Sequence, residues 1–466
     1  MNEFHCLDIE FPDVDFSPCF ESGNTEVAKS FHAHLYVSKD EIELKIFYEE
    51  DRYRCFVEKL DAWTNKIDWK KFGSFIKVAI TQNHTNERIQ KIDLSEAKLL
   101  NLNNGTDYYE NNKKYVILKI DTVKFYCNPN EENKNTAEFY FDDKGFRVVE
   151  PFYGNFRPKT LFKNDGNFNI GRMNDSTKFY KLGISKFRPE FNLVSKDNRK
   201  NRVATITKEP KIQFKYQNGI TEEKAIFYSD VVLMLASFYH HLKIDYTLRR
   251  IHLPESTITI RNIEEKNFLD RTGGLQGFGI NDGLNKFFEL SWQKVTIKNY
   301  ELLSKAITLF NQSHLVDNSS AFLIRYNIIE ICGKTSAEDG IWNFKLKNDE
   351  LDKFFNDTRE SISNIIDETE QEYFNNKWNS IQNIIKSKSL RKQLEDSLTK
   401  HDINVESLPI RTSKIVQLRN NITHGSLDKV NVEDLRKANI LLYRISGILI
   451  LNLMGIKDWK LNTEIK

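Results

Sequence analysis

The sequence predicts an α+β protein in which a β-rich antiparallel N-terminal region is followed by an all-α helical bundle. In the first half, apolar and polar residues alternate in short runs separated by Asn, Asp and Gly. From about Asn299 onward, apolar residues recur three and four positions apart, which is typical of helices buried along one face. We therefore predict three parts, which are residues 1–228 (β-rich region), 229–297 (mixed connector with a glycine-rich loop) and 298–466 (helical domain).

Three alternating runs in the first part predict antiparallel strands. Residues 31–50 contain two strand-like segments around a hairpin turn at residues 38–40. Residues 113–128 and 135–154 repeat the pattern, the second around a turn at residues 143–145. Asn, Asp and Gly at such breaks suit the tight connections of antiparallel sheets. A sandwich and a curled sheet both fit this pattern.

The connector predicts one helix, two strands and a linker. Ser229 or Asp230 can cap a helix that runs to about Leu242. Residues 245–253 and 256–263 alternate as strands do, and the glycine-rich residues 271–283 are interpreted as a linker or a mobile loop. The helical domain that follows is expected to contain five or six amphipathic helices.

Composition, cysteine spacing and hydropathy limit where the protein can act. The 68 basic and 66 acidic side chains give a net charge of +2, which excludes a surface coated with positive charge for nucleic acid. The five cysteines are irregularly spaced, so we expect reduced, buried thiols in a cytoplasmic protein. No signal peptide is expected, and the apolar residues 438–455 are interrupted by Arg444 and predict a core helix rather than a membrane span.

A short polar motif, LRNNITHG, ends one of the predicted helices. Arg419 and Asn420 are followed by His424, and Gly425 can adopt the left-handed conformation that closes a helix. Side chains five positions apart point about 140° away from one another around a helix, so one helix aims Arg419 and His424 poorly at a common atom. Two copies that meet across a two-fold axis would bring both side chains into one cleft, so the spacing predicts a homodimer.

The motif resembles the R-N-x-x-x-H signature of the HEPN ribonuclease superfamily. The preceding helix, FLIRYNIIEICG, is similar to a helix of that family, with Glu330 at its acidic position. The whole layout, with a β-rich region, the segment LMLASFYHHLKIDYTLRR and a terminal helical bundle, resembles ApeA-type bacterial anti-phage proteins.

The resemblance implies a metal-independent endoribonuclease that needs no cofactor. His424 would be the general acid or base, and Arg419 would hold the phosphate oxygens as negative charge builds. Asn420 would bind a phosphate oxygen or orient the histidine, and Glu330 would pair with Arg419 to fix its rotamer. Further RNA contacts are expected from polar neighbours of the motif and from the basic segment KSKSLRK, namely Asn421, Thr423, Lys386, Lys388, Arg391 and Lys392.

The resemblance also implies a role in anti-phage defence. The enzyme would cleave cellular RNA, with tRNA as one candidate, and cause abortive infection when the N-terminal region senses a phage-derived trigger. An alternative is a non-catalytic dimerisation or nucleotide-binding module in a phage-sensing adaptor. Arg419 and His424 could also merely bond the last carbonyls of their helix. A metal-dependent nuclease acting on DNA is disfavoured because the sequence contains no convincing carboxylate cluster.

Two pairs of histidines are weaker candidates. His32 and His34 would share one face of a strand, as metal ligands can, but the sequence places no third ligand nearby. We therefore interpret them as surface or packed histidines and expect no metal site. His240 and His241 are adjacent on a predicted helix, so they point to different sides and make a poor metal pair.

Overall fold

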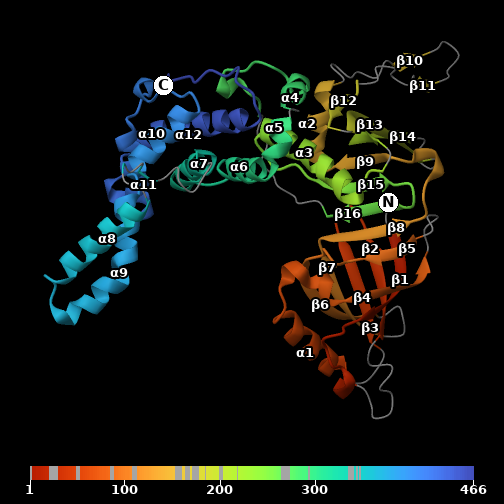
Figure 1. Ribbon diagram of the computed structural model, residues 1–466. Helices are drawn as coiled ribbons and strands as arrows, with labels where there is room; N and C mark the ends of the chain where they lie inside the picture. The colour runs from red at the N-terminus through yellow and green to blue at the C-terminus, as the bar shows by residue number, and fades with distance from the viewer. Residues whose placement is uncertain are drawn as a thin grey trace. The chain divides into compact units, whose positions relative to one another are not determined.

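The structure is a computed structural model of the chain. It describes residues 3–19, 30–48, 53–83, 89–107, 113–152, 160–162, 168–170, 178–183, 185–198, 203–217, 219–263, 273–291, 294–333, 341–342, 345 and 348–465. The chain divides into two compact units (Figure 1). The β unit comprises Met1–Ala236 and Ile244–Asp270, and the helical unit comprises Ser237–Lys243 and Arg271–Lys466. The predicted fold class, antiparallel β followed by a helical region, is confirmed.

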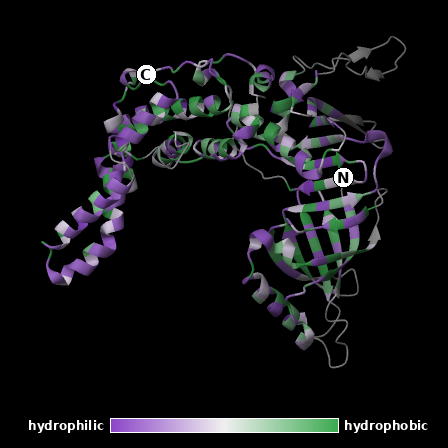
Figure 2. Cartoon of the chain, in the orientation of Figure 1, coloured by the Kyte–Doolittle hydropathy of each residue, from purple (hydrophilic) through white to green (hydrophobic). Residues whose placement is uncertain are grey.

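The first sheet of the β unit has six strands in the order β4-β1-β2-β3-β7-β6, and every neighbouring pair is antiparallel. Apolar and polar residues alternate along these strands, which Figure 2 shows as alternating colours. The predicted hairpin is confirmed, because Val37 pairs with Ile42 and the amide of Ser38 donates to the carbonyl of Glu41 over 2.8 Å. The strands are β1 (Glu3–Glu10), β2 (Ser30–Val37), β3 (Ile42–Tyr48), β4 (Lys77–Asn83), β6 (Leu99–Asp107) and β7 (Lys113–Ile120).

The second sheet has eight antiparallel strands in the order β12-β13-β14-β9-β15-β16-β8-β5. Its strands β15 and β16 are the two predicted in the connector, so that segment completes this sheet instead of forming a separate part. The strands are β5 (Ile89–Asp93), β8 (Thr122–Cys127), β9 (Thr136–Phe141), β12 (Tyr180–Leu182), β13 (Ser185–Asn198), β14 (Val203–Tyr216), β15 (Tyr246–His252) and β16 (Thr257–Asn262). A separate two-stranded ribbon pairs β10 (Thr160–Phe162) with β11 (Phe168–Ile170).

Strands β7 and β8 are adjacent in the chain but belong to different sheets. Asp121 alone separates them, and its carboxylate accepts a hydrogen bond from the amide of Lys98 over 2.8 Å while its carbonyl accepts one from Ile263 over 3.0 Å. These bonds fix the point at which the chain leaves the first sheet. The alternating pattern of residues 113–128 predicted both strands but not the change of sheet.

Two expectations for local structure in the β unit were wrong. The run after the turn at residues 143–145 forms the short helix α2 (Phe146–Val149), in which Val148 and Val149 are buried, and not a strand. Helix α3 (Glu222–His240) begins well before Ser229, because the hydroxyl of Thr221 accepts from the amide of Lys224 and its carbonyl starts the helix. Local apolar alternation cannot distinguish a short buried helix from a strand.

The expectation that all five thiols are reduced was also wrong. Cys19, at the end of the 3-10 turn Ser17–Cys19, forms a disulfide with Cys55 of helix α1 (Tyr53–Thr64), with their Cα atoms 5.5 Å apart. The turn packs against α1, and the 36-residue separation along the chain gave no sign of this contact. The other three cysteines, Cys6, Cys127 and Cys332, are buried thiols.

The helical unit is built around a long buried helix, α12, which packs along α7. Most apolar side chains of α12 are buried, from Leu435 near its start to Leu453 at its end. The helices after α3 are α4 (Leu284–Ser291), α5 (Lys294–Lys298), α6 (Tyr300–Gln312), α7 (Asn318–Gly333), α8 (Asn348–Ser363), α9 (Glu368–Lys386), α10 (Leu390–Lys400), α11 (Thr412–Thr423) and α12 (Val432–Leu453). Of these, α10 covers a segment in which the sequence predicted only a basic cluster.

Helices α8 and α9 pack on each other around a small core of their own. Leu351, Phe355 and Trp378 are buried there. The remaining residues of the two helices are mainly hydrophilic (Figure 2). None of the described helices combines the length and the apolar character that a membrane-spanning helix requires.

The glycine-rich segment is packed, not a free linker. Arg271 and Thr272 lie outside the described residues, but Phe278 is fully buried and its ring lies against Gly447 of α12, where an added Cβ would come within 2.1 Å of it. The amide of Gly274 donates to the carbonyl of Tyr239 over 2.7 Å. Gly279 has φ of +74°, a conformation that favours glycine. The glycines therefore allow close packing in the helical unit.

Candidate functional site

The motif helix α11 ends as the sequence predicts. Gly425 has φ of +74°, its amide donates to the carbonyl of Ile422 over 3.1 Å, and the amide of Ser426 donates to the carbonyl of Asn421 over 2.8 Å. These two bonds form a Schellman motif, which satisfies the last carbonyls of the helix through backbone amides. His424 is the first residue beyond the helix, with φ of −92° and ψ of 9°. Side chains are therefore not needed to cap this helix.

Neighbouring helices hold α11 in place near its start. The hydroxyl of Thr412 donates to the carboxylate of Glu395 on α10 over 2.7 Å, and Lys414 forms an ion pair of 3.1 Å with Asp434 on α12. Ile415 and Leu418 are buried on one face. The opposite end of α11, which carries the motif, is fixed by the Schellman turn.

Arg419 and Asn420 are half-buried and face each other. Nη1 of Arg419 donates to Oδ1 of Asn420 over 3.4 Å, which is near the limit for a hydrogen bond. Asn420 thus holds the guanidinium. Its carbonyl accepts from the amide of His424 over 2.9 Å, but among the described residues no hydrogen bond joins its side chain to the imidazole. Arg419 likewise forms no ion pair in the described part of the chain, so its charge is available to an anion.

Glu330 does not pair with Arg419 as the sequence suggested. Within the described residues no ion pair joins these two side chains. Tyr326, one turn before Glu330 on α7, is buried, and burial is the main cause that raises the pKa of its phenol to about 12, while Glu330 raises it further and Arg419 lowers it. Tyr326 therefore lies close enough to interact electrostatically with Glu330 and Arg419. Tyr326 and Glu330 are four positions apart on one face of α7, and this spacing could have identified Tyr326 from the sequence.

The remaining motif residues lie at the exposed end of α11. His424 and Thr423 are exposed, and in the described part of the chain no hydrogen bond or ion pair engages the imidazole. Nδ2 of Asn421 donates to the carbonyl of Lys429 over 3.4 Å, which links the helix end to the following turn. His424 is thus accessible to an external molecule, whereas Asn421 has a structural contact.

The four cations expected to contact RNA are each paired with a carboxylate. Lys386 lies 3.6 Å from Asp352, and Arg391 lies 2.7 Å from Glu395. Asp396 forms ion pairs with both Lys388, over 2.8 Å, and Lys392, over 3.0 Å. The cluster is therefore largely neutralised, and an RNA phosphate would have to compete with these carboxylates.

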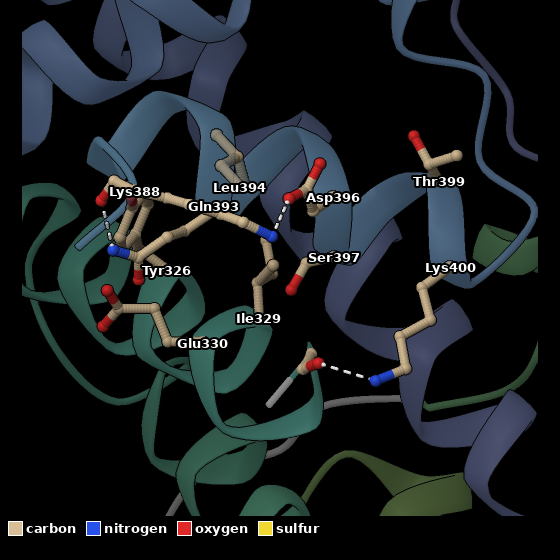
Figure 3. Close-up of a pocket in the computed structure, with 11 residues that line it drawn as sticks. Tyr326, Ile329, Glu330, Lys388, Gln393, Leu394, Asp396, Ser397, Thr399 and Lys400 are labelled. Atoms are coloured by element: carbon tan, nitrogen blue, oxygen red, sulfur yellow. Dashed lines mark hydrogen bonds and ion pairs between the residues drawn. The ribbon is translucent and has the colours of Figure 1, made fainter. Parts of the chain in front are cut away.

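A pocket of about 350 Å³ lies between α7 and α10 (Figure 3). Glu330 and Tyr326 line it from α7, and Lys400 and Asp396 from α10, with Lys388 reaching the carboxylate of Asp396 across it. Nζ of Lys400 also donates to the carbonyl of Gly333 over 3.4 Å. The pocket brings together Glu330 and Lys388, which the sequence proposed for different reasons, but its lining excludes Arg419, Asn420 and His424.

His240 is the last residue of α3 and His241 follows it, and the surroundings of His241 do not suit a metal ligand. His241 adopts φ of +54° and stacks on His314, with ring centroids 5.4 Å apart, beside Phe310 and Tyr443. Burial among these rings lowers the pKa of His241 to about 4. This histidine is a neutral member of the helical unit's core.

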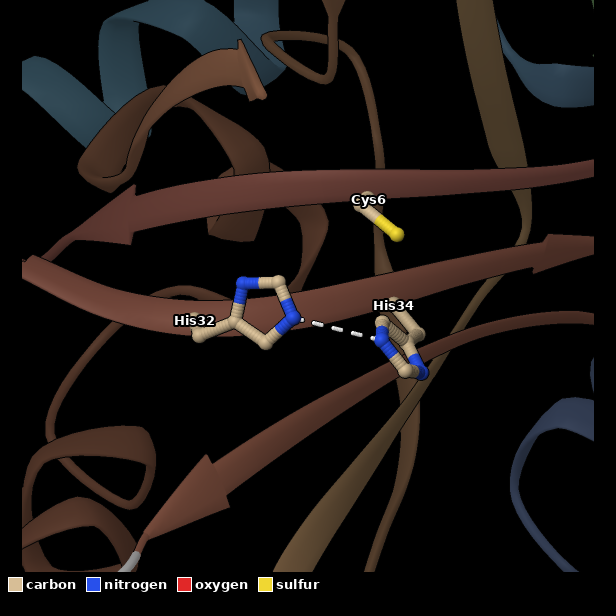
Figure 4. Close-up of side chains that lie close together, drawn as sticks. All are labelled: Cys6, His32 and His34. Carbon is tan, nitrogen blue, oxygen red and sulfur yellow. Dashed lines mark hydrogen bonds between the residues drawn. The ribbon is translucent and has the colours of Figure 1, made fainter. Parts of the chain in front are cut away.

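In the β unit, the structure supplies the third ligand that the sequence did not place beside His32 and His34. Cys6 lies on the neighbouring strand, and its Sγ and one nitrogen of each imidazole all lie within 4.8 Å of one another (Figure 4). Cys6 lies 26 and 28 residues before the two histidines in sequence, so only the pairing of β1 with β2 reveals the group. The expectation of surface or packed histidines rested on the lack of a third ligand nearby, and that premise was wrong.

No protein-family model, no curated protein and no solved structure matches the chain.

Proposed function

We propose that the protein is a metal-independent endoribonuclease of the HEPN type, with its catalytic residues on α11. The observation that carries this proposal is that Arg419 and His424 are neither used to cap the helix nor paired with a carboxylate in the described part of the chain. A Schellman turn already satisfies the end of the helix, so Arg419 and His424 are not needed as caps. Arg419 is half-buried beside Asn420, and among the described residues no carboxylate forms an ion pair with it. His424 is exposed at the end of the helix. A fixed cation next to an accessible imidazole suits phosphate chemistry.

The proposed reaction is transesterification of the RNA backbone. The 2′-hydroxyl oxygen attacks the adjacent phosphorus, and the bond between phosphorus and the 5′-oxygen breaks, which leaves a 2′,3′-cyclic phosphate and a 5′-hydroxyl. One imidazole takes the proton of the 2′-hydroxyl or gives a proton to the leaving 5′-oxygen. The guanidinium of Arg419 binds the non-bridging oxygens, whose negative charge grows in the transition state. Asn420 positions that guanidinium.

The active enzyme is proposed to be a homodimer joined through the helical unit. Arg419 and His424 lie five positions apart and point to different sides of the end of α11, so a site that uses both takes Arg419 from one copy and His424 from the other. Leu427 and Val432 flank the loop after His424 and are 57% and 77% exposed, although both are large apolar side chains. A second copy packed across a two-fold axis would cover them and bring the partner's motif to the same cleft.

The biological role proposed is defence against phage in the cytoplasm. Cleavage of cellular RNA, including tRNA, would stop growth of the infected cell, and the β unit would restrain the enzyme until it binds a phage-derived trigger. These assignments rest on the resemblance of the motif and layout to ApeA-type proteins. The disulfide between Cys19 and Cys55 is unusual for a cytoplasmic protein and is the observation that opposes this location.

Trans-complementation tests this function. Purified Arg419→Ala and His424→Ala proteins would each be incubated with total cellular RNA in EDTA, and each should cleave at least about 100-fold more slowly than the wild type. A mixture of the two, exchanged into mixed dimers, should recover about a quarter of wild-type activity if each site takes Arg419 from one chain and His424 from the other. Arg411→Ala is the matched control, because Arg411 is exposed at the start of the same helix and makes no cap bond.

A second candidate function is a nucleotide-binding adaptor. The pocket between α7 and α10 favours it, because a volume of about 350 Å³ lies in the range of small-ligand sites and its lining does not include the motif. Phage protection that survives both motif substitutions, with folding intact, would reject the nuclease and favour the adaptor. Loss of protection in both variants, with Arg411→Ala unaffected, would reject the adaptor.

A further inference from the structure

The first two strands of the β unit present three metal-binding side chains on one face. Strands β1 and β2 pair antiparallel, with Cys6 opposite His34 and Asp8 opposite His32. Their intervening neighbours, including Leu7 and Ala33, are fully buried in the core of the unit. Because side chains alternate between the faces of a sheet, the other four residues share the opposite face. The two cross-strand pairs thus place a thiol, two imidazoles and a carboxylate side by side on this face.

The distances between the donor atoms fit one metal ion. Nε2 of His32 lies 3.2 Å from Nε2 of His34. Two nitrogens bound to one tetrahedral zinc at about 2.05 Å lie about 3.3 Å apart, and a bound nitrogen and sulfur lie about 3.6 Å apart. All three donor atoms already lie within 4.8 Å of one another, so small side-chain rotations would complete the geometry. Figure 4 shows the two rings turned toward each other below the sulfur of Cys6.

The surroundings of the group orient the two imidazoles. Nδ1 of His32 faces Oδ1 of Asp8 at 3.8 Å, which leaves Nε2 directed toward His34. A carboxylate behind the second nitrogen of a ligating histidine is the usual support of such a ligand. The ring of His34 lies edge-on to Phe4 and Phe47, with centroids 4.7 Å and 4.6 Å away. These contacts limit its rotation and shield one side of the group from water.

The ammonium of the neighbouring Lys45 does not need to oppose a metal ion. Lys45 lies opposite His34 on β3, but its ammonium lies over the ring of Tyr115, 4.2 Å from the centroid. Cys6 is 9% exposed, whereas the side chain of His32 is 50% exposed, so the group opens to solvent on the histidine side. An ion can enter from that side.

We propose that Cys6, His32 and His34 bind a Zn²⁺ ion, with a water molecule as the fourth ligand and Asp8 as the positioning residue behind His32. One thiolate and two imidazoles are the donors that zinc prefers, and they are unsuited to Mg²⁺ or Ca²⁺, which take oxygen ligands. Binding releases the thiol proton of Cys6 to solvent. The ion links β1 to β2, so it should stabilise the β unit, and its open position can accept an exchangeable ligand.

The first test measures zinc in the purified full-length protein. The protein would be stripped with EDTA, reloaded and analysed for metal content, and it should retain about one Zn²⁺ per chain and unfold at a higher temperature than the stripped form. Cobalt would then replace zinc, because a cobalt–thiolate bond gives a charge-transfer band in the near ultraviolet. No retained zinc, or a cobalt complex without that band, would overturn the proposal.

Variants assign the ligands. Cys6→Ser should abolish the cobalt–thiolate band, while Cys127→Ser, which removes a buried thiol of β8, should keep it. His32→Asn should weaken zinc binding at least about 10-fold and should fold normally, because that side chain is half-exposed. Asp8→Asn should weaken binding about 10-fold to 100-fold and keep the band, as expected of a positioning residue. Wild-type affinity in both Cys6→Ser and His32→Asn would show that the imidazoles form a hydrogen bond and not a metal site.

Discussion

The two candidate sites are built by the chain in opposite ways. In the helical unit, Arg419, Asn420 and His424 come from one short stretch at the end of α11, and in the proposed enzyme a second copy completes the site. In the β unit, Cys6 and the two histidines come from paired strands, and one copy holds all three proposed ligands. The first site can be recognised by its spacing and, under our proposal, needs a second copy of the chain. The spacing shows only two of the three residues of the second site, His32 and His34, and this site needs no partner.

This difference follows from the geometry of helices and sheets. A helix brings together residues three and four positions apart, so its functional groups leave a local pattern. A sheet brings together residues whose separation depends on the length of the connecting loop, so its functional groups leave no fixed spacing. Searches for short motifs therefore favour sites like that on α11 and overlook sites like that on β1 and β2.

Removing one large core side chain from each unit is the strongest test that the units are independent. Phe278→Ala and Phe125→Ala each remove a fully or almost fully buried ring, so each should lower the free energy of unfolding by about 3–5 kcal/mol. Hydrogen exchange should show faster exchange in α7 and α12 for Phe278→Ala, and in β8 and β16 for Phe125→Ala. If either change loosened both units equally, they would unfold as one, and the comparison of two separate sites would lose its basis.

Acid should destabilise the helical unit before the β unit. Burial lowers the pKa of His241 from 6.5 to about 4, so the neutral ring contributes stability that is present above pH 6.5 and is lost as the pH falls toward 4. In the β unit, burial raises the pKa of Glu3, but His5 and Arg261 outweigh it and lower the value from 4.5 to about 2, so that loss begins only below pH 4.5.

The variant His241→Asn sharpens this contrast, because Asn tolerates the positive φ at this position but does not titrate. At about 1.4 kcal/mol per pKa unit, the wild type should lose about 2–3 kcal/mol more than the variant between pH 6.5 and pH 4. Thermal unfolding of both proteins across this range measures the difference. Parallel curves for the two proteins would show that His241 does not set the acid sensitivity.

Two glycine substitutions give the smallest effects and separate stability from function. Gly425 and Gly219 have φ of +74° and +81°, and an added Cβ at either position meets no atom within 4 Å. Each change to Ala should therefore cost about 1–2 kcal/mol through backbone strain alone. Only Gly425→Ala should slow RNA cleavage, because the turn at Gly425 places His424. Equal cleavage by the two variants, measured with the same RNA, would show that the turn does not position a catalytic group.

The sequence by itself determined the features that depend on neighbouring residues. The 3.6-residue period predicted α6, α7 and α12, the alternation around residues 38–40 predicted β2 and β3, and Gly425 predicted the end of α11. Each of these depends on hydrogen bonds and side-chain contacts within a few positions of the chain. The motif of the candidate active site was found for the same reason.

Only the tertiary structure decided the features that join distant residues. It assigned β7 and β8 to different sheets, packed Phe278 against Gly447, and paired Cys19 with Cys55. In the folded chain, carboxylates also pair with the basic residues around Lys388, and Cys6 lies beside His32 and His34. The pairing of strands and the burial of side chains depend on the free energy of the whole fold, and many loop lengths allow the same contact. For that reason no local pattern in the sequence encodes them.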